Sequence, residues 1–381
     1  MKVVPFDQAA IPQSDKGKRL KQRDYLQEGS LAVIDQGQQQ VGGYTDDQTM
    51  AFEGELPVVL FGDHTRSVKL VNHSFAVGAD GIKIFRPAEG VRTKYLFYWM
   101  KGAPIPDRGY GRHYQFLRQL SVPLPSEDEQ DEIVAELEKQ FSRLDEAVAN
   151  LQRVKANLKR YKASVLKAAV EGRLVETEDD WTRAKLGDIA LSVRNGYSSK
   201  PDADSGTRIF RISAVRPMEL TVDDVRYLSG APADYGTFLT EEGDVLFTRY
   251  NGSRDYVGVC AQVPTGLPPT VYPDKLIRVR VPTDQLLPAF LVISASTGEG
   301  REFIESMIRT TAGQSGVSGS DIKAIPLSIP TMAEQTRIVA EVDRHLSIIR
   351  EVEAEVDANL QRAQALRQAT LATAFGLNST P

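Results

Sequence analysis

Two loops in the chain carry arginine, asparagine and histidine side chains directly after matching apolar runs. The first is GDHTRSVK (62–69), which follows the run VLF at 59–61. The second is TRYNGSRD (248–255), which follows VLF at 245–247. Arginine donates two hydrogen bonds to the edge of guanine, and asparagine or glutamine pairs in the same way with adenine. Loops at equal positions with different side chains could therefore read two sets of bases, although solvated turns are the simpler alternative.

Further loops offer the same donors and acceptors. They are KGKRLKQR (16–23), IDQGQQQ (34–40) and IPDRGYGRHY (105–114) in the first half of the chain, and RNGYSSK (194–200) and TTAGQSGVSGS (310–320) in the second. If the chain binds DNA, the candidate contact residues are Lys18, Arg19, Gln38, His64, Arg66, Lys69, Arg108, Arg112, Arg194, Tyr197, Lys200, Arg249, Asn251, Arg254 and Gln314.

No set of residues has the spacing of a catalytic or metal-binding site. The phosphate-loop pattern G-x-x-x-x-G-K-[S/T] is absent from the sequence, as is the Asn/Asp-Pro-Pro-aromatic pattern of adenine methyltransferases. The histidines, His64, His73, His113 and His345, are too scattered for a metal-ligand motif. The single cysteine, Cys260, can form neither an intramolecular disulfide nor a multi-cysteine metal site. We therefore expect no catalytic residues, no metal and no cofactor in this chain.

Length and composition are those of a multidomain globular protein. The chain has 381 residues, of which 41% are hydrophobic and 25% charged. It contains no run of 18 apolar residues, and the segment 1–20 lacks the apolar core of a signal peptide. With one cysteine, these features lead us to expect a cytoplasmic protein that does not enter a membrane.

The net charge of −5 is distributed unevenly along the chain. Residues 1–125 carry a net charge of +3, whereas 126–178 and 179–330 carry −3 each and 331–381 carry −2. Because no segment is a polycation, non-specific attraction to phosphates should be weak. Binding to nucleic acid would need local basic patches or a basic partner protein.

Two nearly identical helix entrances organise the chain. PSEDEQDEIVAE (125–136) and PTMAEQTRIVAE (330–341) match at seven of twelve positions, with a constant offset of 205 residues. In each, a serine or threonine after the proline precedes a glutamate by three residues, which is a capping box. Apolar residues then recur at helical spacing towards Gly172 and Gly376. Each pattern predicts a helix of about 45 residues, roughly 65–70 Å long.

Each predicted helix has a single apolar seam, so each needs a partner, and the other helix is the nearest candidate. The residues expected to pair the helices are Leu144, Leu151, Leu158, Tyr161, Ile349, Val356, Ala363 and Leu366. We expect an antiparallel coiled coil, because the domain between the helices can return the chain. The alternative is that they are two unrelated core helices.

The repeat extends to the segments that precede each helix. Short β-branched and aromatic runs alternate with turns in the same order in both halves, ending in TKYLFYWM (93–100) and LPAFLVIS (287–294), each of which predicts a short helix. The predicted fold is α+β, with two similar globular domains, each followed by a long helix, in a pseudo-two-fold arrangement. The expected boundaries are 1–125 and 176–330 for the domains, and 126–175 and 331–377 for the helices. We expect the start of the chain to lack a full counterpart of Trp181–Ala190.

Two similar domains with different loops, each joined to a stiff helix, are suited to a bipartite asymmetric DNA site with an unread spacer. The paired P-[S/T]-x-x-E-Q-x-x-I-V-A-E entrances and the helix ends LKAAVEGRL (166–174) and LATAFGLN (371–378) resemble those of specificity subunits of type I restriction–modification systems. The resemblance covers nearly the whole chain.

The resemblance implies two target-recognition domains, each reading one half of a site on double-stranded DNA, and paired helices that set the spacer length. It implies a non-catalytic chain that docks two DNA adenine methyltransferase (modification) subunits, with ATP-driven restriction subunits as a further partner class. S-adenosylmethionine and ATP would then bind the partner subunits. The alternative function is a coiled-coil scaffold whose globular domains bind proteins or glycans.

Overall fold

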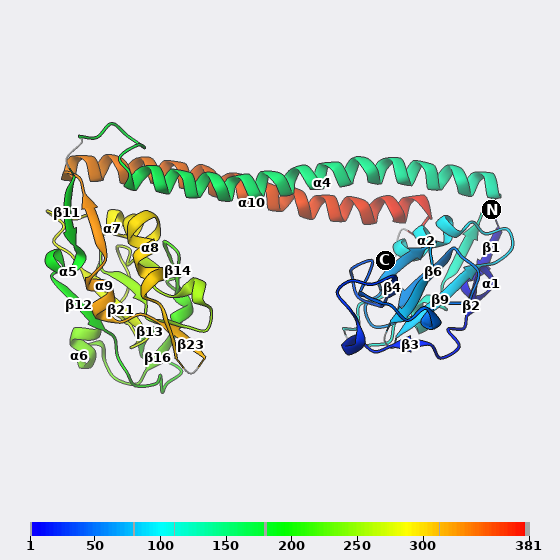
Figure 1. The fold of residues 1–381 in the computed structure, drawn as a ribbon, viewed down its shortest axis with the longest axis horizontal. Coiled ribbons are helices and arrows are strands. Elements are labelled where there is room, and N and C mark those ends of the chain that lie inside the picture. The colour runs from blue at the N-terminus through cyan, green and yellow to red at the C-terminus, as the bar shows by residue number, and fades with distance from the viewer. Residues whose placement is uncertain (1, 79–80, 110, 179–180, 312, 378–381) are drawn as a thin grey trace. The chain divides into compact units, whose positions relative to one another are not determined.

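The structure, a computed structural model, describes residues 2–78, 81–109, 111–178, 181–311 and 313–377. It divides into two compact units, Met1–Arg153 with Val356–Pro381, and Val154–Glu355. Each unit combines one globular domain with one segment of each of two long helices, α4 (Glu127–Val170) and α10 (Met332–Ala374) (Figure 1). The predicted helices are therefore confirmed, as is the mixed α and β character of the domains.

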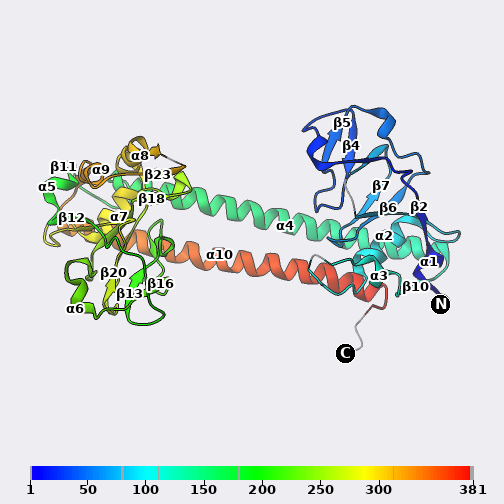
Figure 2. The ribbon, with the colours of Figure 1, turned by 90° about the horizontal axis from the view of Figure 1, so that it is seen from below.

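The first domain contains two four-stranded sheets, which Figure 2 shows side by side. One has the order β2-β9-β6-β7 and is antiparallel throughout; the other has the order β3-β8-β4-β5, with β8 parallel to both of its neighbours. The elements are β1 (Lys2–Pro5), α1 (Phe6–Ala9), β2 (Ala10–Gln13), β3 (Arg19–Leu20), η1 (Gln22–Asp24), β4 (Leu31–Ile34), β5 (Gly43–Thr45), η2 (Gln48–Met50), β6 (Val58–Gly62), β7 (Val68–Val71), β8 (Phe75–Gly78), β9 (Ile82–Pro87), α2 (Thr93–Gly102), α3 (Tyr114–Leu117) and β10 (Ser121–Leu124).

The second domain repeats the antiparallel sheet of the first domain and part of its second sheet. Its antiparallel sheet has the order β12-β21-β17-β19, and its second sheet has the order β16-β13-β20, with β13 parallel to β20. The elements are β11 (Thr182–Lys185), α5 (Leu186–Ile189), β12 (Ser192–Asn195), β13 (Thr207–Phe210), η3 (Ile212–Ala214), β14 (Val215–Arg216), β15 (Glu219–Leu220), β16 (Val225–Leu228), α6 (Pro232–Tyr235), η4 (Gly236–Phe238), β17 (Val245–Thr248), β18 (Tyr250–Asn251), η5 (Arg254–Tyr256), β19 (Cys260–Gln262), β20 (Thr270–Val271), β21 (Leu276–Arg280), α7 (Pro288–Ser296), α8 (Gly298–Met307), β22 (Arg309–Thr311), β23 (Gln314–Gly316), α9 (Gly319–Lys323) and β24 (Pro326–Ile329).

The expected lack of a full counterpart of Trp181–Ala190 is corrected for Thr182–Ile189, which Lys2–Ala9 matches, while the position opposite Trp181 lies outside the described residues. β1, α1 and β2 correspond to β11, α5 and β12, and β1 pairs with β10 as β11 pairs with β24. Phe6 N donates to Leu120 O at 3.0 Å, and Leu186 N donates to Ile325 O at 2.9 Å. Phe6 and Leu186 are both fully buried. Most of the residues around Phe6 and Leu186 differ between the two entry segments, so their correspondence is not evident from the sequence.

Both long helices begin with the predicted capping box. Ser126 donates to Glu129 Oε2 at 2.8 Å from both its backbone N and its hydroxyl, and Glu129 N donates back to Ser126 Oγ at 3.4 Å. Thr331 and Glu334 repeat the three bonds at the same distances. These bonds satisfy amides at the helix start that lack intrahelical partners.

The helix segments pair antiparallel within each unit. In the second unit, the Tyr161 hydroxyl on α4 lies 2.9 Å from His345 Nδ1 on α10, and Val165 shares a core with Val342. In the first unit, Arg367 on α10 lies over the ring of Phe141 on α4, with 4.6 Å between its guanidinium and the ring centroid. Residues with higher numbers on α4 therefore contact residues with lower numbers on α10, as expected for antiparallel helices.

The predicted pairing residues differ in burial. Ile349, Val356 and Ala363 are buried, whereas Leu144, Leu151 and Leu158 are half-buried. Tyr161 is largely exposed, although its hydroxyl still contacts His345.

The prediction for Leu366 is corrected, because its side chain is 57% exposed. Leu371 and Phe375 are buried on α10 instead and pack in the core of the first unit. A straight α-helix drifts by about 20° per heptad from a strict seven-residue repeat. The buried residues Ile349, Val356 and Ala363 are spaced by seven residues, and because of this drift the next buried residue, Leu371, follows after eight.

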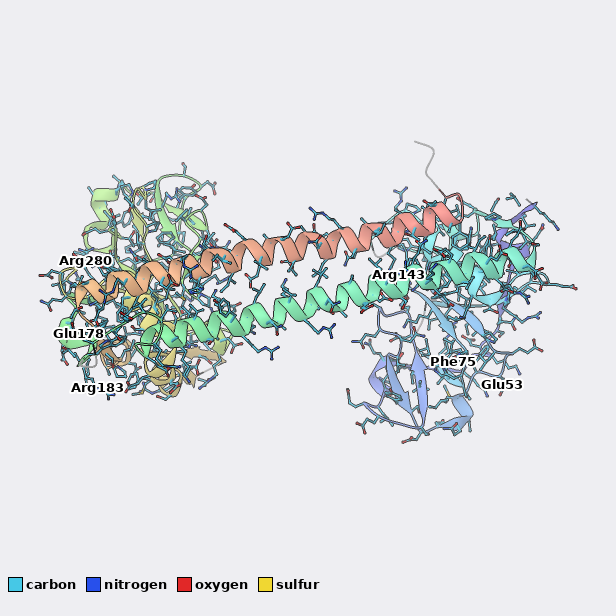
Figure 3. The ribbon with its side chains drawn as sticks, turned by 90° about the horizontal axis from the view of Figure 1, so that it is seen from above. Glu53, Phe75, Arg143, Glu178, Arg183 and Arg280 are labelled. Carbon is cyan, nitrogen blue, oxygen red and sulfur yellow. The ribbon has the colours of Figure 1, made fainter. Side chains whose placement is uncertain are left out.

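The two capping glutamates predict different responses to the same substitution. Glu334 uses both oxygens, since its Oε1 also accepts from the N of Glu178, labelled in Figure 3, at 2.7 Å. Both bonds from Ser126 go to a single oxygen of Glu129. Glu334→Gln should therefore cost about 1 kcal/mol of local stability, whereas Glu129→Gln should change it by less than about 0.5 kcal/mol. Amide hydrogen exchange over the first turns of α10 and α4 measures both costs.

The cost of Glu334→Gln should also depend on pH. The bonds from Glu178 and Thr331 hold the pKa of the Glu334 carboxyl below its ordinary value. A lowered folded pKa gives stability that is complete above the ordinary carboxyl value of about 4.3 and is lost as the pH falls through the lowered one. The difference between wild type and Glu334→Gln should therefore shrink below about pH 4. A difference that grows on acidification would contradict this assignment.

Candidate nucleic-acid interface

Three loops of the first domain form one polar surface. His64 N donates to Gln36 Oε1 at 3.2 Å, and the Ser67 hydroxyl donates to Gln36 O at 2.7 Å, which joins the loop after β6 to the loop after β4. His64 Nδ1 donates to Gly111 O at 3.2 Å, which adds the loop before α3. These joined loops contain four of the predicted residues, His64, Arg66, Arg108 and Arg112. Gln38 is exposed in the loop after β4.

A buried aspartate–histidine pair holds the backbone of these loops in place. Asp63 and His113 are buried, and the backbone N and the Nδ1 of His113 both donate to Asp63 O at 2.9 Å. Asp63 Oδ1 accepts from Tyr114 N at 2.8 Å, and His113 Nε2 accepts from Arg108 N at 3.3 Å. His113 is therefore a structural residue that fixes the backbone of Arg108.

Arg66 is held in a defined position on the same surface. Its backbone has a φ of 58°, in the left-handed region, and its guanidinium donates to Ile105 O at 3.2 Å and to Asp107 Oδ2 at 2.6 Å. The bond from Gly109 N and the charge of Arg66 lower the pKa of Asp107. A guanidinium has five N–H donors, so Arg66 keeps donors for a phosphate or a base.

Lys18 and Arg19 form ion pairs outside these three loops. Lys18 Nζ lies 2.5 Å from Glu53 and 2.9 Å from Thr49 O, and Arg19 pairs with Asp15. Hydrogen bonds from Lys16 and Lys18 lower the pKa of Glu53, labelled in Figure 3, to about 2. Lys18 thus belongs to an ion-paired cluster around Glu53, and Arg19 is paired with Asp15.

Lys69 lies inside the first domain, so it is not retained as a DNA contact. It is 3% exposed, and its ammonium donates to Asp35 O at 2.6 Å. Burial lowers the pKa of Lys69, and Asp35 opposes this effect. Residues alternate between the two faces of a strand, and on β7 the inward face carries Lys69 and Val71.

In the second domain, two predicted loops form a single three-stranded sheet. β18 pairs with β23, and β23 pairs with β22, so Asn251 lies opposite Ser315 and next in register to Gln314. The loop 248–255 and the segment 309–316 are thus parts of one surface. Asn251 Oδ1 accepts from Ser253 N at 3.0 Å, which orients its amide.

Arg249 connects this sheet to a third loop. Its guanidinium lies 4.7 Å from the ring centroid of Tyr250 and donates to Asp274 O at 3.4 Å. Asp274 N donates to Tyr197 O at 2.8 Å, and Arg249 N donates to Lys275 O at 2.8 Å. Tyr197 is thereby brought towards Arg249.

A cavity of about 470 Å³ lies beside these residues. Its lining includes Tyr197 and four cationic side chains, Lys200, Arg211, Arg226 and Lys275, with Asp274 as a carboxylate. The excess of positive over negative side chains in this lining favours binding of an anionic group. Aromatic and guanidinium planes also stack on bases. The arrangement can bind phosphates and base edges.

Two of the predicted residues in the second domain lie apart from this group. Arg194 is exposed on β12, where it pairs in register with Arg278. Arg254 donates to the backbone O of Glu305 at 3.1 Å, at the end of α8.

Asp274 and Lys275 were not predicted for this site, nor was the anchoring role of Asp63 and His113. Tyr250 lies in the predicted loop 248–255, directly after Arg249. Asp274 and Lys275 lie in a turn that only the tertiary fold brings beside Tyr197.

Nothing in the described part of the chain forms a metal-binding group of three or more histidine, cysteine, aspartate or glutamate residues. Among the helices of the same residues, none is both long and apolar enough to cross a membrane.

Comparison with known proteins gives a consistent group of relatives. No protein-family model matches the chain. The chain is 34% identical over 265 residues to the specificity subunit of the type I restriction enzyme EcoKI from Escherichia coli K12, which covers 67% of the chain and 57% of that protein. It is 27% identical over 306 residues to the StySPI specificity subunit from Salmonella potsdam, which covers 76% and 66%. The match thus spans less than two thirds of the length of either relative.

Two solved structures share the fold. One, described as the structural basis of complex assembly and conformational transition of the type I R-M system, has a TM-score of 0.71, 13% identity and coverage of 98% of this chain and 97% of that chain. The HsdS subunit from Thermoanaerobacter tengcongensis has a TM-score of 0.53, 15% identity and coverage of 98% and 96%. These likenesses show the fold over nearly the whole chain.

Removal of either central arginine should weaken specific DNA binding. We expect Arg249→Ala and Arg66→Ala each to cost roughly 1–3 kcal/mol on the cognate duplex, because each loses a base or phosphate contact. Arg183→Ala is the control, since it removes one positive charge from the exposed strand β11, outside this surface. It should lower binding to all sequences slightly and mainly at low salt. Titration of the assembled complex on cognate and scrambled duplexes measures these effects.

Wild-type affinity of both variants for the cognate duplex would show that these loops are not the readers. A loss that is equal on cognate and scrambled DNA would assign the arginines to phosphates alone.

Proposed function

We propose that this chain, a homologue of the specificity subunits of type I restriction enzymes, is a non-catalytic subunit that selects a bipartite, asymmetric DNA sequence. Each domain would read one half of the site. The main support for the proposal is that the two domains share a sheet architecture but differ in the side chains of their loops. The two domains share the strand order of their antiparallel four-stranded sheets, β2-β9-β6-β7 and β12-β21-β17-β19, while the loops that follow β6 and β17 carry different side chains.

The long helices are proposed to set the distance between the half-sites. α4 and α10 are each continuous through both units, and each begins at the end of a domain with the same capping box. A continuous α-helix has a fixed rise of about 1.5 Å per residue, so its length translates into a fixed separation. A spacer of defined length is the expected consequence.

The repeated helix entrances also support the proposed partners. Two equivalent surfaces on one chain suit two copies of the same protein, and we propose DNA adenine methyltransferase subunits in this role. S-adenosylmethionine would bind those subunits, and ATP would bind restriction subunits where these are present. The proposed location is the cytoplasm, where such a complex meets chromosomal DNA.

The charge of the chain fits a recognition subunit that depends on its partners. The chain has a net charge of −5, and only residues 1–125 have a net positive charge, of +3. Because affinity for DNA depends mainly on the number of phosphates neutralised, the partners would supply much of the binding free energy. The alternative function, a scaffold whose domains bind proteins or glycans, is not favoured, since the curated relatives are specificity subunits.

Genome-wide mapping of methylated adenine tests the proposal. Wild-type cells should contain one bipartite motif with a fixed spacer, and deletion of this gene alone should abolish methylation at that motif. Complementation with the gene should restore the same motif, which controls for effects on the neighbouring genes. A methylation pattern that is unchanged by the deletion would contradict the proposed function.

A further inference from the structure

One glutamine in each unit is completely buried at the start of the long helix. Gln130 and Gln335 are both 0% exposed, and they occupy the same place in the two repeated entrances. An amide side chain offers two N–H donors and one carbonyl acceptor. A polar group buried to this extent is stable only when its hydrogen bonds are made.

Both glutamines make the same three hydrogen bonds. Gln130 Nε2 donates to Gly90 O at 2.8 Å and to Pro125 O at 3.0 Å, and its Oε1 accepts from Arg92 N at 2.8 Å. Gln335 Nε2 donates to Gln285 O and to Pro330 O, both at 3.0 Å, and its Oε1 accepts from Leu287 N at 2.8 Å. We refer to each set of three bonds as a glutamine clamp.

Each clamp joins three parts of its unit. The proline carbonyl belongs to the segment that leaves the last strand, β10 or β24, and the other two partners belong to the turn before α2 or α7. The glutamine itself lies in the first turns of α4 or α10. The clamp therefore fixes the start of the long helix against both the sheet exit and a domain helix.

Local capping does not provide this connection. The bonds between Ser126 and Glu129 lie within one turn, so they determine where α4 begins and not where it points. The ion pairs of Arg92 with Glu127 and Asp131 do reach α4, at 3.0 and 3.1 Å, but their side chains are about half exposed and such pairs are weak. Buried bonds to three fixed backbone atoms constrain direction far better.

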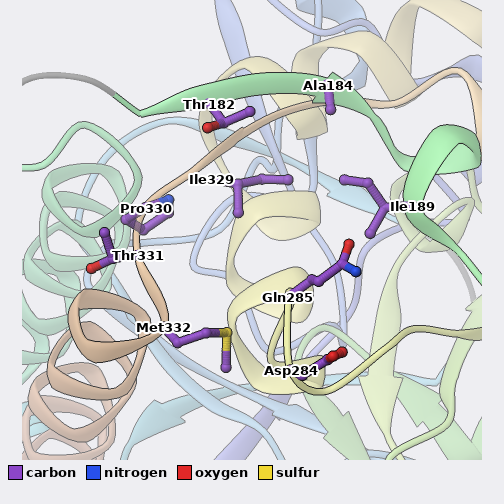
Figure 4. Close-up of a pocket in the computed structure, with 9 residues that line it drawn as sticks. All are labelled: Thr182, Ala184, Ile189, Asp284, Gln285, Ile329, Pro330, Thr331 and Met332. Carbon is purple, nitrogen blue, oxygen red and sulfur yellow. The ribbon is translucent and has the colours of Figure 1, made fainter.

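The second unit also leaves open space beside the clamp. Figure 4 shows a cavity of about 370 Å³ lined by Gln285, Ile329, Pro330 and Met332, next to the start of α10. Two of these lining residues, Gln285 and Pro330, also accept the hydrogen bonds of Gln335, so the clamp joins residues that border the open space.

We propose that Gln130 and Gln335 are positioning residues that set the direction in which each long helix leaves its domain. For a chain with the function proposed above, on which this inference rests, that direction determines the spacer length the complex accepts. The clamps thus act on spacer specificity, while the loops act on base specificity.

The test compares spacer lengths with the full chain in its complex. Gln335→Met and Gln130→Met keep the side-chain volume but leave two carbonyls and one amide without partners. Duplexes carry the motif mapped from wild-type cells, with its native spacer or with one base pair more or fewer, and initial methylation rates are measured. Thr331→Ala and Ser126→Ala are matched controls, because they remove the cap from the same turn and leave the clamp intact.

In each glutamine variant, the ratio of rates on native and altered spacers should fall about tenfold, which corresponds to the loss of a buried hydrogen bond. Half-site preference should remain that of wild type. The cap controls should lower thermal stability and keep the wild-type ratio. Equal loss of rate on all spacers in the glutamine variants would overturn the proposal and leave the clamp with a role in folding only.

If Gln335→Met does not fold, Gln130→Met tests the same claim in the other unit. Failure of both to fold overturns the proposal as well, since it assigns the clamps to direction and not to folding. A wild-type complex that methylates no bipartite motif would instead refute the proposed function, and this outcome is visible before any variant is made.

Discussion

The structure depends on how each long helix is joined to its globular domain, and the two junctions are built from the same set of hydrogen bonds. A proline ends the last strand, a hydroxyl and a glutamate cap the helix, and a buried glutamine ties its first turns to the turn before a domain helix. The bonds agree between the two units to within 0.2 Å, although the surrounding residues differ. Unpaired polar groups at such a depth would be costly, so the geometry is narrowly defined. Everything proposed about spacing depends on these two junctions.

Much of the fold could be predicted from the sequence, because the signals were local. The capping boxes, the helical spacing of apolar residues and the V-L-F runs located α4, α10, β6 and β17 without tertiary information. What could not be predicted depended on distant pairing. The match between β1–α1–β2 and β11–α5–β12 rests on strand pairing with β10 and β24 and on the equivalent buried residues Phe6 and Leu186. The exposure of Leu366 follows from the phase drift of a straight helix, which a strict heptad reading does not include.

The candidate interface was predictable in its loops and not in its details. Arginine and amide residues marked the loops, but whether a given side chain is available depends on strand alternation and on ion pairing. Lys69 faces inward on β7, and Lys18 is engaged by Glu53, so two of the basic residues that seemed equivalent in the sequence have other partners. Arg249 gains its position from Tyr250 and Asp274, which the sequence did not connect. The two domains thus share a scaffold and differ in how each loop surface is assembled, as two readers of different half-sites would.

The central claim is that each domain reads one half of a bipartite site. A footprint of the assembled complex on a duplex containing the methylated motif tests it most directly, when wild type is compared with a variant in which only the loop 62–67 or only the loop 248–255 is replaced. The account predicts two protected segments separated by an accessible spacer, with the first variant losing protection over one half and the second over the other half. Loss of protection over both halves in each variant, or a single continuous footprint that neither variant changes, would contradict it.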